Sequence, residues 1–329
     1  MVILRSVSLH ISKPSHLSES LFNRFLELSE SVGDVWTRRA VLPEGLREET
    51  ITDLINKLDQ VDLIAVPFNR HSSFMMKLLE DPRIFVSLPL TEKSADLVCE
   101  ISKKIGEGAC TQLGFFHGSR LVTPYFPVTK STRTGFSSCM RVIPDMVGSK
   151  DPAARFEEIS REVNSLLVEA SAEHSVPFLG IDLSISPWME ESCVDLMKVM
   201  FGVTVGEPGT ISAIWEINRL LSRVSKKVRS TGFNELMLPY AEDDGLMRLA
   251  KEGRLRARDL VAMVSVCVAG LDMVVIPRDL KVVRALLRDV RAIAVRKRRS
   301  VGVRVIPTEA QVGEEIKLER FTTVPVMSP

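Results

Sequence analysis

The sequence contains few of the residues that build disulfide frameworks and imidazole metal sites. Its five cysteines are an odd number, and no two of them stand at C-x-x-C spacing. This pattern argues against a disulfide framework and against a zinc ribbon. The five histidines are scattered along 329 residues, so we expect no metal site. The glycine-rich signatures of nucleotide-binding loops are also absent, which leaves the cofactor unknown.

Aromatic residues and an excess of one charge are lacking as well. Aromatics make up 6% of the chain, and 43 Lys and Arg stand against 42 Asp and Glu, for a formal net charge of +1. The stacking surfaces and overall basicity of nucleic-acid-binding proteins are therefore missing, and we expect no nucleic-acid partner. Few glutamines, with more arginine than lysine, are typical of thermophilic proteins.

The sequence has no segment that is long and apolar enough to cross a bilayer. Its most apolar stretch, residues 261–277, is short and contains Asp272. Residues 1–12 show no basic region followed by an apolar core, so no signal peptide is indicated. We therefore expect a cytoplasmic protein without a membrane partner.

Apolar runs of strand length alternate with helical patterns over the whole chain. Several runs end directly in proline, which cannot donate to a strand ladder. These prolines are Pro67, Pro89, Pro144, Pro187, Pro239, Pro277 and Pro307. About ten runs are apolar without alternation, as in strands covered on both faces. This predicts an α/β fold, either a closed barrel or one large doubly wound sheet, in a single domain over residues 1–329.

The clearest helical pattern covers residues 151–174. Asp151 suits the N-cap, and Pro152 suits the first helical position. The apolar residues at 156, 159, 163, 166 and 170 then form one buried face. Further helices are predicted at residues 15–31 and 279–299.

A tetrapeptide occurs twice, at residues 141–144 and 304–307. The match arises by chance, or it indicates a barrel built from two related halves.

The segment Gly180–Pro187 alternates apolar and polar residues. Period two places Asp182, Ser184 and Ser186 on one face of a strand. Three small polar side chains that line an interior could bind a hydroxyl, an amide or a cation. The alternative is an edge strand with one solvated face.

The segment Val205–Thr210 opens a predicted helix. Gly206 and Gly209 let the backbone approach a ligand closely. The free N–H groups at the helix start would donate hydrogen bonds to a phosphate or carboxylate, held by Gly209 and Thr210. The alternative is a plain tight turn with Thr210 as the N-cap.

Acidic residues follow the apolar run that ends at Pro239. Glu242 and Asp243 stand at a predicted helix start, where negative charge complements the helix dipole. In the functional alternative they bind a cation or transfer protons as a general base.

Cys267 and Asp272 lie in a segment of small and apolar residues. A cysteine in such surroundings is usually an inert hydrophobe, and it becomes a nucleophile only if a positive group or a helix start lowers the thiol pKa. Asp272 needs a partner if it is buried. We mark both as candidate catalytic residues.

Four basic residues, Arg296–Arg299, close a predicted helix. They favour the negative end of the helix dipole and are solvated there in the simplest interpretation. Contact with nucleic acid is the alternative.

The C-terminal half resembles uncharacterised protein family 0210, also called domain of unknown function 711. The matching segments are Gly180–Pro187, Gly206–Thr210, Pro239–Met247, Val266–Pro277, Val303–Pro307 and Val324–Met327. The resemblance implies a barrel similar to that of glycyl-radical enzymes such as pyruvate formate-lyase, with about ten strands in two halves and helices outside. It implies no activity. The R-V-x-G-Y-type loop of those enzymes is missing, since its nearest counterpart is Ser300–Arg304, and we therefore expect no radical chemistry.

Two functions follow from these features. The first is an enzyme that acts on a small anionic metabolite in the barrel interior, with Cys267, Asp272, Glu242 and Asp243 as catalytic candidates. Its ligand-binding candidates are Asp182, Ser184, Ser186, Gly206, Gly209, Thr210 and Arg304. The second is a binding or sensor protein that uses the same pocket without turnover. A homo-oligomer is compatible with either.

Overall fold

The structure, a computed structural model, describes residues 3–318 and 321–329. The chain forms two compact units, each assembled from segments that are distant in sequence. The first unit contains residues 1–87, 120–185 and 220–234, and the second contains residues 88–119, 186–219 and 235–329. The single domain expected from the sequence stays a prediction.

The first unit is built on a sheet with the strand order β4-β3-β2-β1-β6-β7. These strands are β1 (Ile3–His10), β2 (Arg38–Val41), β3 (Leu63–Pro67), β4 (Ile84–Pro89), β6 (Gly135–Arg141) and β7 (Phe178–Asp182). β1 to β4 run parallel, whereas β6 runs antiparallel to β1 and parallel to β7. In this register Val7 of β1 lies opposite Arg38 on one side and Ser138 on the other.

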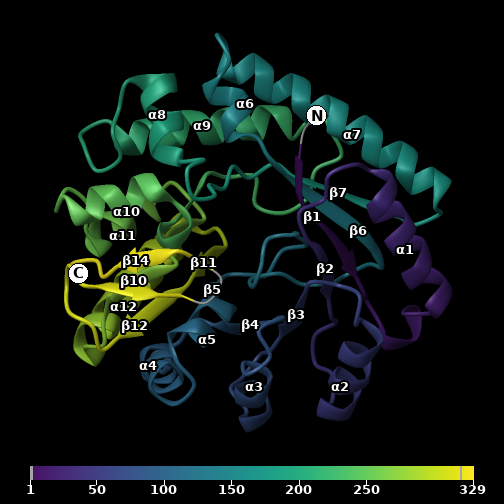
Figure 1. The fold of residues 1–329 in the computed structure, drawn as a ribbon, viewed down its shortest axis with the longest axis horizontal. Coiled ribbons are helices and arrows are strands. Elements are labelled where there is room, and N and C mark those ends of the chain that lie inside the picture. Colours follow the sequence, from purple (N-terminus) through teal and green to yellow (C-terminus); the bar gives the residue numbers. More distant parts are fainter. Residues whose placement is uncertain (1–2, 319–320) are drawn as a thin grey trace. The chain divides into compact units, whose positions relative to one another are not determined.

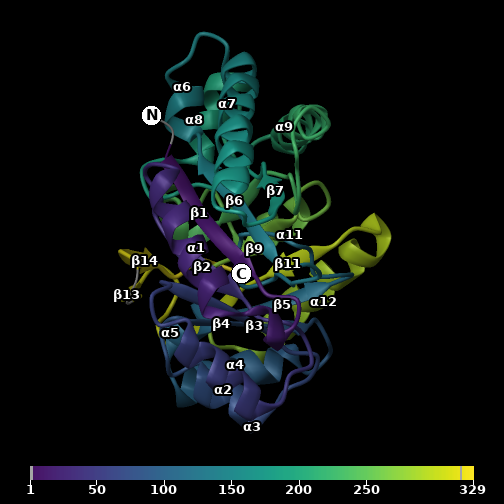
Figure 2. The ribbon, with the colours of Figure 1, turned by 90° about the vertical axis from the view of Figure 1, so that its right-hand side faces the viewer.

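Helices connect the strands of the first unit. They are η1 (Pro14–His16), α1 (Glu19–Ser31), α2 (Glu48–Lys57), α3 (Ser73–Leu78), α6 (Ile143–Val147) and α7 (Pro152–Glu173). α7 packs against β7 and touches α1 (Figures 1 and 2). As predicted, Asp151 caps α7, accepting a hydrogen bond from the Ala154 N–H at 3.0 Å. The predicted buried face is largely confirmed, but Leu167 is buried in place of Leu166, which is 39% exposed.

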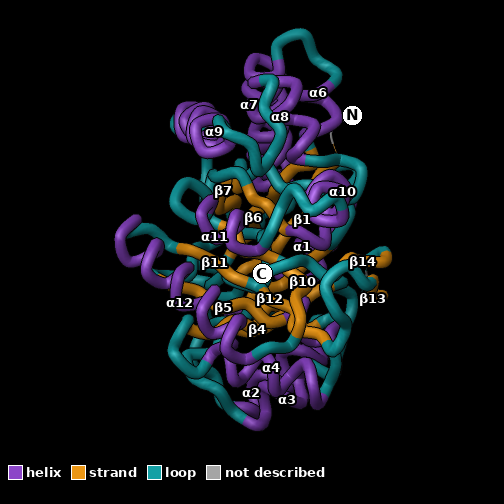
Figure 3. Tube along the Cα trace, turned by 90° about the vertical axis from the view of Figure 1, so that its left-hand side faces the viewer, coloured by secondary structure: helices purple, strands orange, loops and turns teal. Residues whose placement is uncertain are grey.

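The second unit contains several short paired strands. They are β5 (Leu113–His117), β8 (Met237–Pro239), β9 (Ala269–Asp272), β10 (Val274–Pro277), β11 (Val301–Val303), β12 (Val305–Thr308), β13 (Glu315–Lys317) and β14 (Thr323–Pro325). β8 pairs with β9 and β10 with β12, both in parallel, while β5–β11 and β13–β14 are antiparallel. Figure 3 shows the strands β10, β12, β13 and β14 in orange.

The helices of the second unit precede or separate these strands in the sequence. They are α4 (Ser94–Lys104), α5 (Glu107–Gln112), α8 (Cys193–Phe201), α9 (Thr210–Val224), which begins in this unit, η2 (Tyr240–Glu242), α10 (Asp244–Lys251), α11 (Ala257–Met263) and α12 (Leu280–Lys297). α12 packs against α4 and α11 (Figure 1). Its predicted range is confirmed to within a few residues.

The expected α/β architecture is confirmed, with a large sheet and many helices. β3, β4, β8 and β10 end at prolines predicted to stop pairing, whereas Pro307 lies inside the paired strand β12 and Pro144 inside α6, so for these two the prediction is wrong. The sheets in residues 3–318 and 321–329 are open, so the expected closed barrel of about ten strands is not confirmed. No helix in these residues is long and apolar enough to cross a membrane.

The strand expected to carry Asp182, Ser184 and Ser186 ends earlier than predicted. β7 ends at Asp182, because the Ser184 N–H turns back to donate to the Asp182 carboxylate at 3.0 Å instead of joining a strand ladder. The period-two face proposed for Asp182, Ser184 and Ser186 is therefore wrong beyond its first residue.

His10, at the end of β1, is completely buried in the first unit. Its Nδ1 lies 3.2 Å from the Lys130 carbonyl oxygen and its Nε2 lies 2.7 Å from the Ser137 hydroxyl. These partners favour the neutral ring with the proton on Nδ1. Burial lowers the His10 pKa from 6.5 to about 4, although the hydrogen bond to Lys130 opposes that shift.

We predict that His10 destabilises the protein in mild acid. Between about pH 6.5 and pH 4 the unfolded chain binds a proton at His10 that the folded chain does not bind. The stabilisation that the neutral His10 gives is therefore fully present above pH 6.5 and is lost as the pH falls toward 4. The linked loss amounts to about 3 kcal/mol. Urea unfolding at pH 7.5 and 4.5 should show a smaller loss for His10→Gln than for wild type. His16→Gln, at an exposed histidine, is the control, and equal losses in all three proteins would contradict the prediction.

Candidate active site

Two carboxylates and one guanidinium meet in the second unit at the ends of parallel strands. Asp272 is the last residue of β9, and Glu242 lies in the turn η2 directly after β8, the parallel neighbour of β9. Arg304 stands between β11 and β12. The carboxyl ends of parallel strands are where α/β proteins place ligands, because loops and side chains converge there.

The three side chains form a nearly buried ion cluster. The Arg304 Nε and Nη2 donate to the two oxygens of Asp272 at 2.6 and 2.8 Å, a bidentate pair. The same Nη2 donates to Glu242 Oε1 at 3.1 Å. The exposed fraction of each residue is below a tenth. The sequence marked all three as separate candidates, and the fold brings them together.

Burial and charge act in opposite directions on these groups. Burial raises the pKa of Asp272, and the Arg304 charge and hydrogen bonds oppose that rise. Burial also acts to lower the Arg304 pKa, but Asp272 and Glu242 outweigh it and raise that pKa above its ordinary value. Arg304 therefore keeps its charge, while Asp272 is the carboxyl more readily protonated than a surface aspartate.

A residue with strained backbone angles helps to hold the loops of the cluster in place. Met273, which follows Asp272, has φ of 54° and is fully buried. Its carbonyl accepts from Ala241 N at 3.3 Å, and the next residue, Val274, donates its N–H to the Arg304 carbonyl at 3.3 Å. A left-handed non-glycine residue costs roughly 1–2 kcal/mol and persists only where its surroundings hold it. The kink between β9 and β10 is thus tied to the loops that carry Glu242 and Arg304.

Asp243 follows Glu242 in the sequence, but its carboxylate binds the starts of neighbouring helices. One oxygen accepts from the Ser192 hydroxyl at 2.5 Å and from Gly245 N at 2.9 Å, and the other accepts from Cys193 N at 2.9 Å. It therefore joins the starts of α8 and α10. Burial raises its pKa to about 6, against these hydrogen bonds. Nothing in this arrangement gives Asp243 the catalytic role proposed from the sequence.

Asp182 and Ser184 belong to the first unit, and Ser186 to the second. The buried Asp182 carboxylate accepts from the Thr123 hydroxyl at 2.5 Å, from the Ser184 hydroxyl at 2.6 Å and from the N–H groups of Phe233 and Asn234 at 3.0 and 3.1 Å. The carboxylate occupies the space that a side chain at residue 232 would need. A Cβ on Gly232 would stand 1.9 Å from it. Asp182 thus links the loop that contains Thr123 to the loop that contains Phe233 and Asn234.

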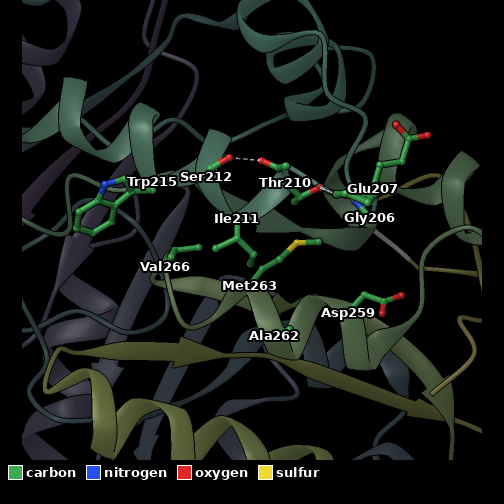
Figure 4. Close-up of a pocket in the computed structure, with 12 residues that line it drawn as sticks. Gly206, Glu207, Thr210, Ile211, Ser212, Trp215, Asp259, Ala262, Met263 and Val266 are labelled. Carbon is green, nitrogen blue, oxygen red and sulfur yellow. Dashed lines mark hydrogen bonds between the residues drawn. The ribbon is translucent and has the colours of Figure 1, made fainter.

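The loop Gly206–Thr210 closes on itself. The Thr210 hydroxyl accepts from Gly206 N at 3.1 Å and donates to the Glu207 carbonyl at 2.7 Å, which is the tight-turn alternative considered from the sequence. The loop also borders an open groove of about 670 Å³ between the start of α9 and α11. In Figure 4 the apolar side chains of Ile211 and Met263 point toward one another in this groove.

Trp215 is the groove residue that sequence reasoning missed. Its indole is 55% exposed, and Ile211, four residues earlier on α9, is 42% exposed. The spacing of four was a readable signal, because residues i and i+4 share one helix face. The groove is lined by the acids Glu207 and Asp259 and by no basic residue. It therefore suits an apolar or cationic group better than an anion.

Cys267 is fully buried beside β9. Burial raises the pKa of its thiol to about 12, although the nearby Lys297 charge opposes the shift. The Lys297 ammonium donates to the Cys267 carbonyl at 2.9 Å and pairs with Glu235 at 3.1 Å. The thiolate needed for nucleophilic attack is therefore disfavoured at neutral pH. Within residues 3–318 and 321–329, no group of three or more His, Cys, Asp or Glu is arranged to hold a metal.

We predict that Cys267 is chemically inert in the folded protein. Iodoacetamide at pH 8 should alkylate the partly buried Cys99 at least about tenfold faster than Cys267, because reaction requires both access and thiolate. Peptide mass spectrometry after timed labelling measures both rates, and labelling in urea provides the control for intrinsic reactivity. Equal rates in the folded protein would contradict the prediction and return Cys267 to the list of nucleophiles.

Comparison with known proteins shows that the segment carrying the cluster matches a known family. Residues 150–319 match the family described as Uncharacterised ACR (DUF711), a span that includes Glu242, Asp272 and Arg304. A UPF0210 protein of Halothermothrix orenii is 32% identical over 178 residues, which cover 52% of this chain and 39% of that protein. A UPF0210 protein of Lacticaseibacillus casei is 30% identical over 196 residues, 54% of this chain and 42% of that protein.

A UPF0210 protein of Pyrobaculum arsenaticum is 35% identical over 145 residues, which cover 42% of this chain and 32% of that protein. The chain thus spans less than half the length of the relatives it matches. These similarities do not confirm a relationship to the glycyl-radical enzyme barrel. Because the family match takes in more than half of the chain, the protein belongs to the DUF711 family.

Proposed function

We propose that the protein is an enzyme that acts on a small carboxylate- or phosphate-bearing metabolite at the Glu242–Asp272–Arg304 cluster, without radical chemistry. The observation that carries the proposal is the cluster itself. It joins two carboxylates and one permanent cation at the carboxyl ends of neighbouring parallel strands. The proposed reaction takes place in the cytoplasm, since all five cysteines are free thiols, as in a reducing compartment.

Arg304 would bind the anionic group of the substrate. Its two-pronged pair with Asp272, at 2.6 and 2.8 Å, is the stronger contact and would hold the guanidinium plane in position. Its single contact with Glu242, at 3.1 Å, is the one that a substrate anion would replace. Guanidinium groups recognise carboxylates and phosphates through the same fork of N–H donors.

The carboxyl groups would then transfer protons. Burial raises the pKa of Asp272 above its ordinary value, which favours a role for this carboxyl group in proton transfer. Glu242 would be the second carboxylate beside the substrate, once the substrate anion has taken its place at Arg304. Neither Cys267 nor Asp243 has a role in this scheme, because one is buried and protonated and the other is engaged in capping helices.

We predict opposite effects of Glu242→Gln on binding and on turnover. Removing the carboxylate that competes for Arg304 should tighten binding of an anionic substrate by roughly tenfold. Losing a proton-transfer group should lower turnover by about 100-fold or more. Thermal unfolding against a panel of carboxylate and phosphate metabolites identifies the ligand, and titration and product analysis then measure the two effects.

Glu216→Gln is the matched control. Glu216 is an exposed glutamate on α9, and among the described residues its one ion pair is with Arg219, at 3.0 Å. It should leave both binding and turnover unchanged. A Glu242→Gln protein with full turnover would remove the cluster from the mechanism.

A second candidate function is ligand binding without turnover at the α9–α11 groove. The exposed side chain of Trp215 favours it, in a groove of about 670 Å³ that is also lined by the apolar residues Ile211 and Met263. We predict that a ligand held there is lost in Trp215→Ala, with an affinity decrease of about tenfold or more. The same ligand should bind Glu242→Gln with unchanged affinity and should be recovered chemically intact. Isothermal titration of the two variants separates this function from the enzymatic one, and unchanged affinity in Trp215→Ala would contradict it.

A further inference from the structure

The exposed face of α12 carries a cluster of arginines that the proposed enzymatic site does not use. Arg288, Arg291, Arg296 and Arg298 line a shallow pocket of about 810 Å³, together with Glu92, Ala292 and Val295. All of these residues belong to the second unit, and α12 packs against α4 there (Figure 1). Four positive side chains stand against one negative side chain, in a protein whose formal net charge is only +1.

Glu92 shows how these arginines hold an oxyanion. Its Oε2 accepts from Arg288 Nε at 2.9 Å, and its Oε1 accepts from Arg291 Nη1 at 2.9 Å. One carboxylate is therefore clasped by two guanidinium groups, each of which has further N–H donors. An arginine presents five donors, so both can hold a second anionic group without releasing Glu92.

Arg296 and Arg298 lie further along the same pocket and form no ion pair with any residue that the structure describes. The C-terminal end of a helix carries a partial negative charge of about half an elementary charge, which accounts for a fraction of this positive charge and no more. Arg298 itself adopts the left-handed conformation, with φ of 57°, that ends α12. The pocket therefore has a fixed end and two cations that have no ion-pair partner among the described residues.

An apolar floor accompanies the charges. Ala292 and Val295 lie between the arginines on the exposed face of α12, and Val295 is 56% exposed. The volume falls within the range of roughly 300–1,000 Å³ that small-molecule sites occupy. A scarcity of aromatic residues, at 6% of the chain, and a balanced overall charge disfavour a long nucleic acid as the occupant.

We propose that this α12 pocket binds a small molecule that carries two or more linked phosphate groups and an apolar or planar part. Arg296 and Arg298 hold the phosphates, with Arg288 and Arg291 as additional donors. Ala292 and Val295 contact the apolar part. The site is independent of the Glu242–Asp272–Arg304 cluster and involves no covalent step.

The test is isothermal titration of the full chain with ATP and with inorganic pyrophosphate, both free of magnesium, at two salt concentrations. Arg296→Gln combined with Arg298→Gln should weaken ATP binding at least tenfold, and both positions are exposed, so folding should be kept. Glu92→Gln should strengthen binding several-fold, because it removes a negative charge that repels the phosphate groups. Arg219→Gln, an exposed arginine on α9, is the control and should change nothing.

The outcomes separate the alternatives. ATP binding that is lost in the double variant and retained in Glu242→Gln supports the proposal, whether or not the enzymatic function holds. No binding of either probe at millimolar concentration, or equal binding by the double variant, would overturn it. Equal affinity for pyrophosphate and ATP would contradict the proposed contact of Ala292 and Val295 with the apolar part of the ligand. Displacement of ATP by a single-stranded oligonucleotide at far lower concentration, with a salt dependence that indicates many phosphate contacts, would overturn the small-molecule class.

Discussion

The guanidinium of Arg304 controls how the charged residues of the second unit are arranged. It keeps its positive charge at every physiological pH and is almost entirely removed from water, so it must have anionic partners close by. Asp272 and Glu242 supply them from the ends of two parallel strands. Removing one member of such a buried pair typically costs about 3–5 kcal/mol, which couples the positions of the segments that carry them.

The strained backbone at Met273 is a consequence of the same constraint. β9 and β10 would form one continuous strand if residue 273 kept extended angles, but its φ of 54° breaks the line between Asp272 and Val274. Hydrogen bonds from Ala241 and to the Arg304 carbonyl hold the break on both sides. The ion cluster and the kink thus stabilise each other, which explains why a bulky residue tolerates this conformation.

The acidic residues of this protein differ in their partners more than in their chemistry. Asp182 and Asp243 accept hydrogen bonds mainly from backbone N–H groups and neighbouring hydroxyls, and these donors are fixed by the fold. Asp272 and Glu242 pair with a side chain whose donors a ligand can also use. A carboxylate of the first kind holds loops in place, whereas one of the second kind can exchange its partner. This difference supports the proposal that the Arg304 cluster is the site of chemistry.

Local patterns in the sequence determined much of the secondary structure. The cap at Asp151, the apolar face of α7 and the prolines that end β3 and β10 all act over a few residues, so they can be read without a structure. The α/β class followed from their alternation. The sequence also marked Glu242, Asp272 and Arg304 as candidate site residues, and it indicated that Asp272 would need a partner if it were buried. Family membership followed from motifs in the matching half of the chain.

Tertiary structure alone decided which of the marked residues act together. Asp272 and Arg304 are 32 residues apart and Glu242 and Arg304 are 62 apart, and no short-range pattern records which strands become neighbours. The same holds for Asp182, whose partners at residues 123 and 233 appear only when loops meet. Whether Cys267 is a nucleophile was also undecided, because thiol pKa depends on burial. Sequence supplied the chemical groups, and folding determined their partners and their access to water.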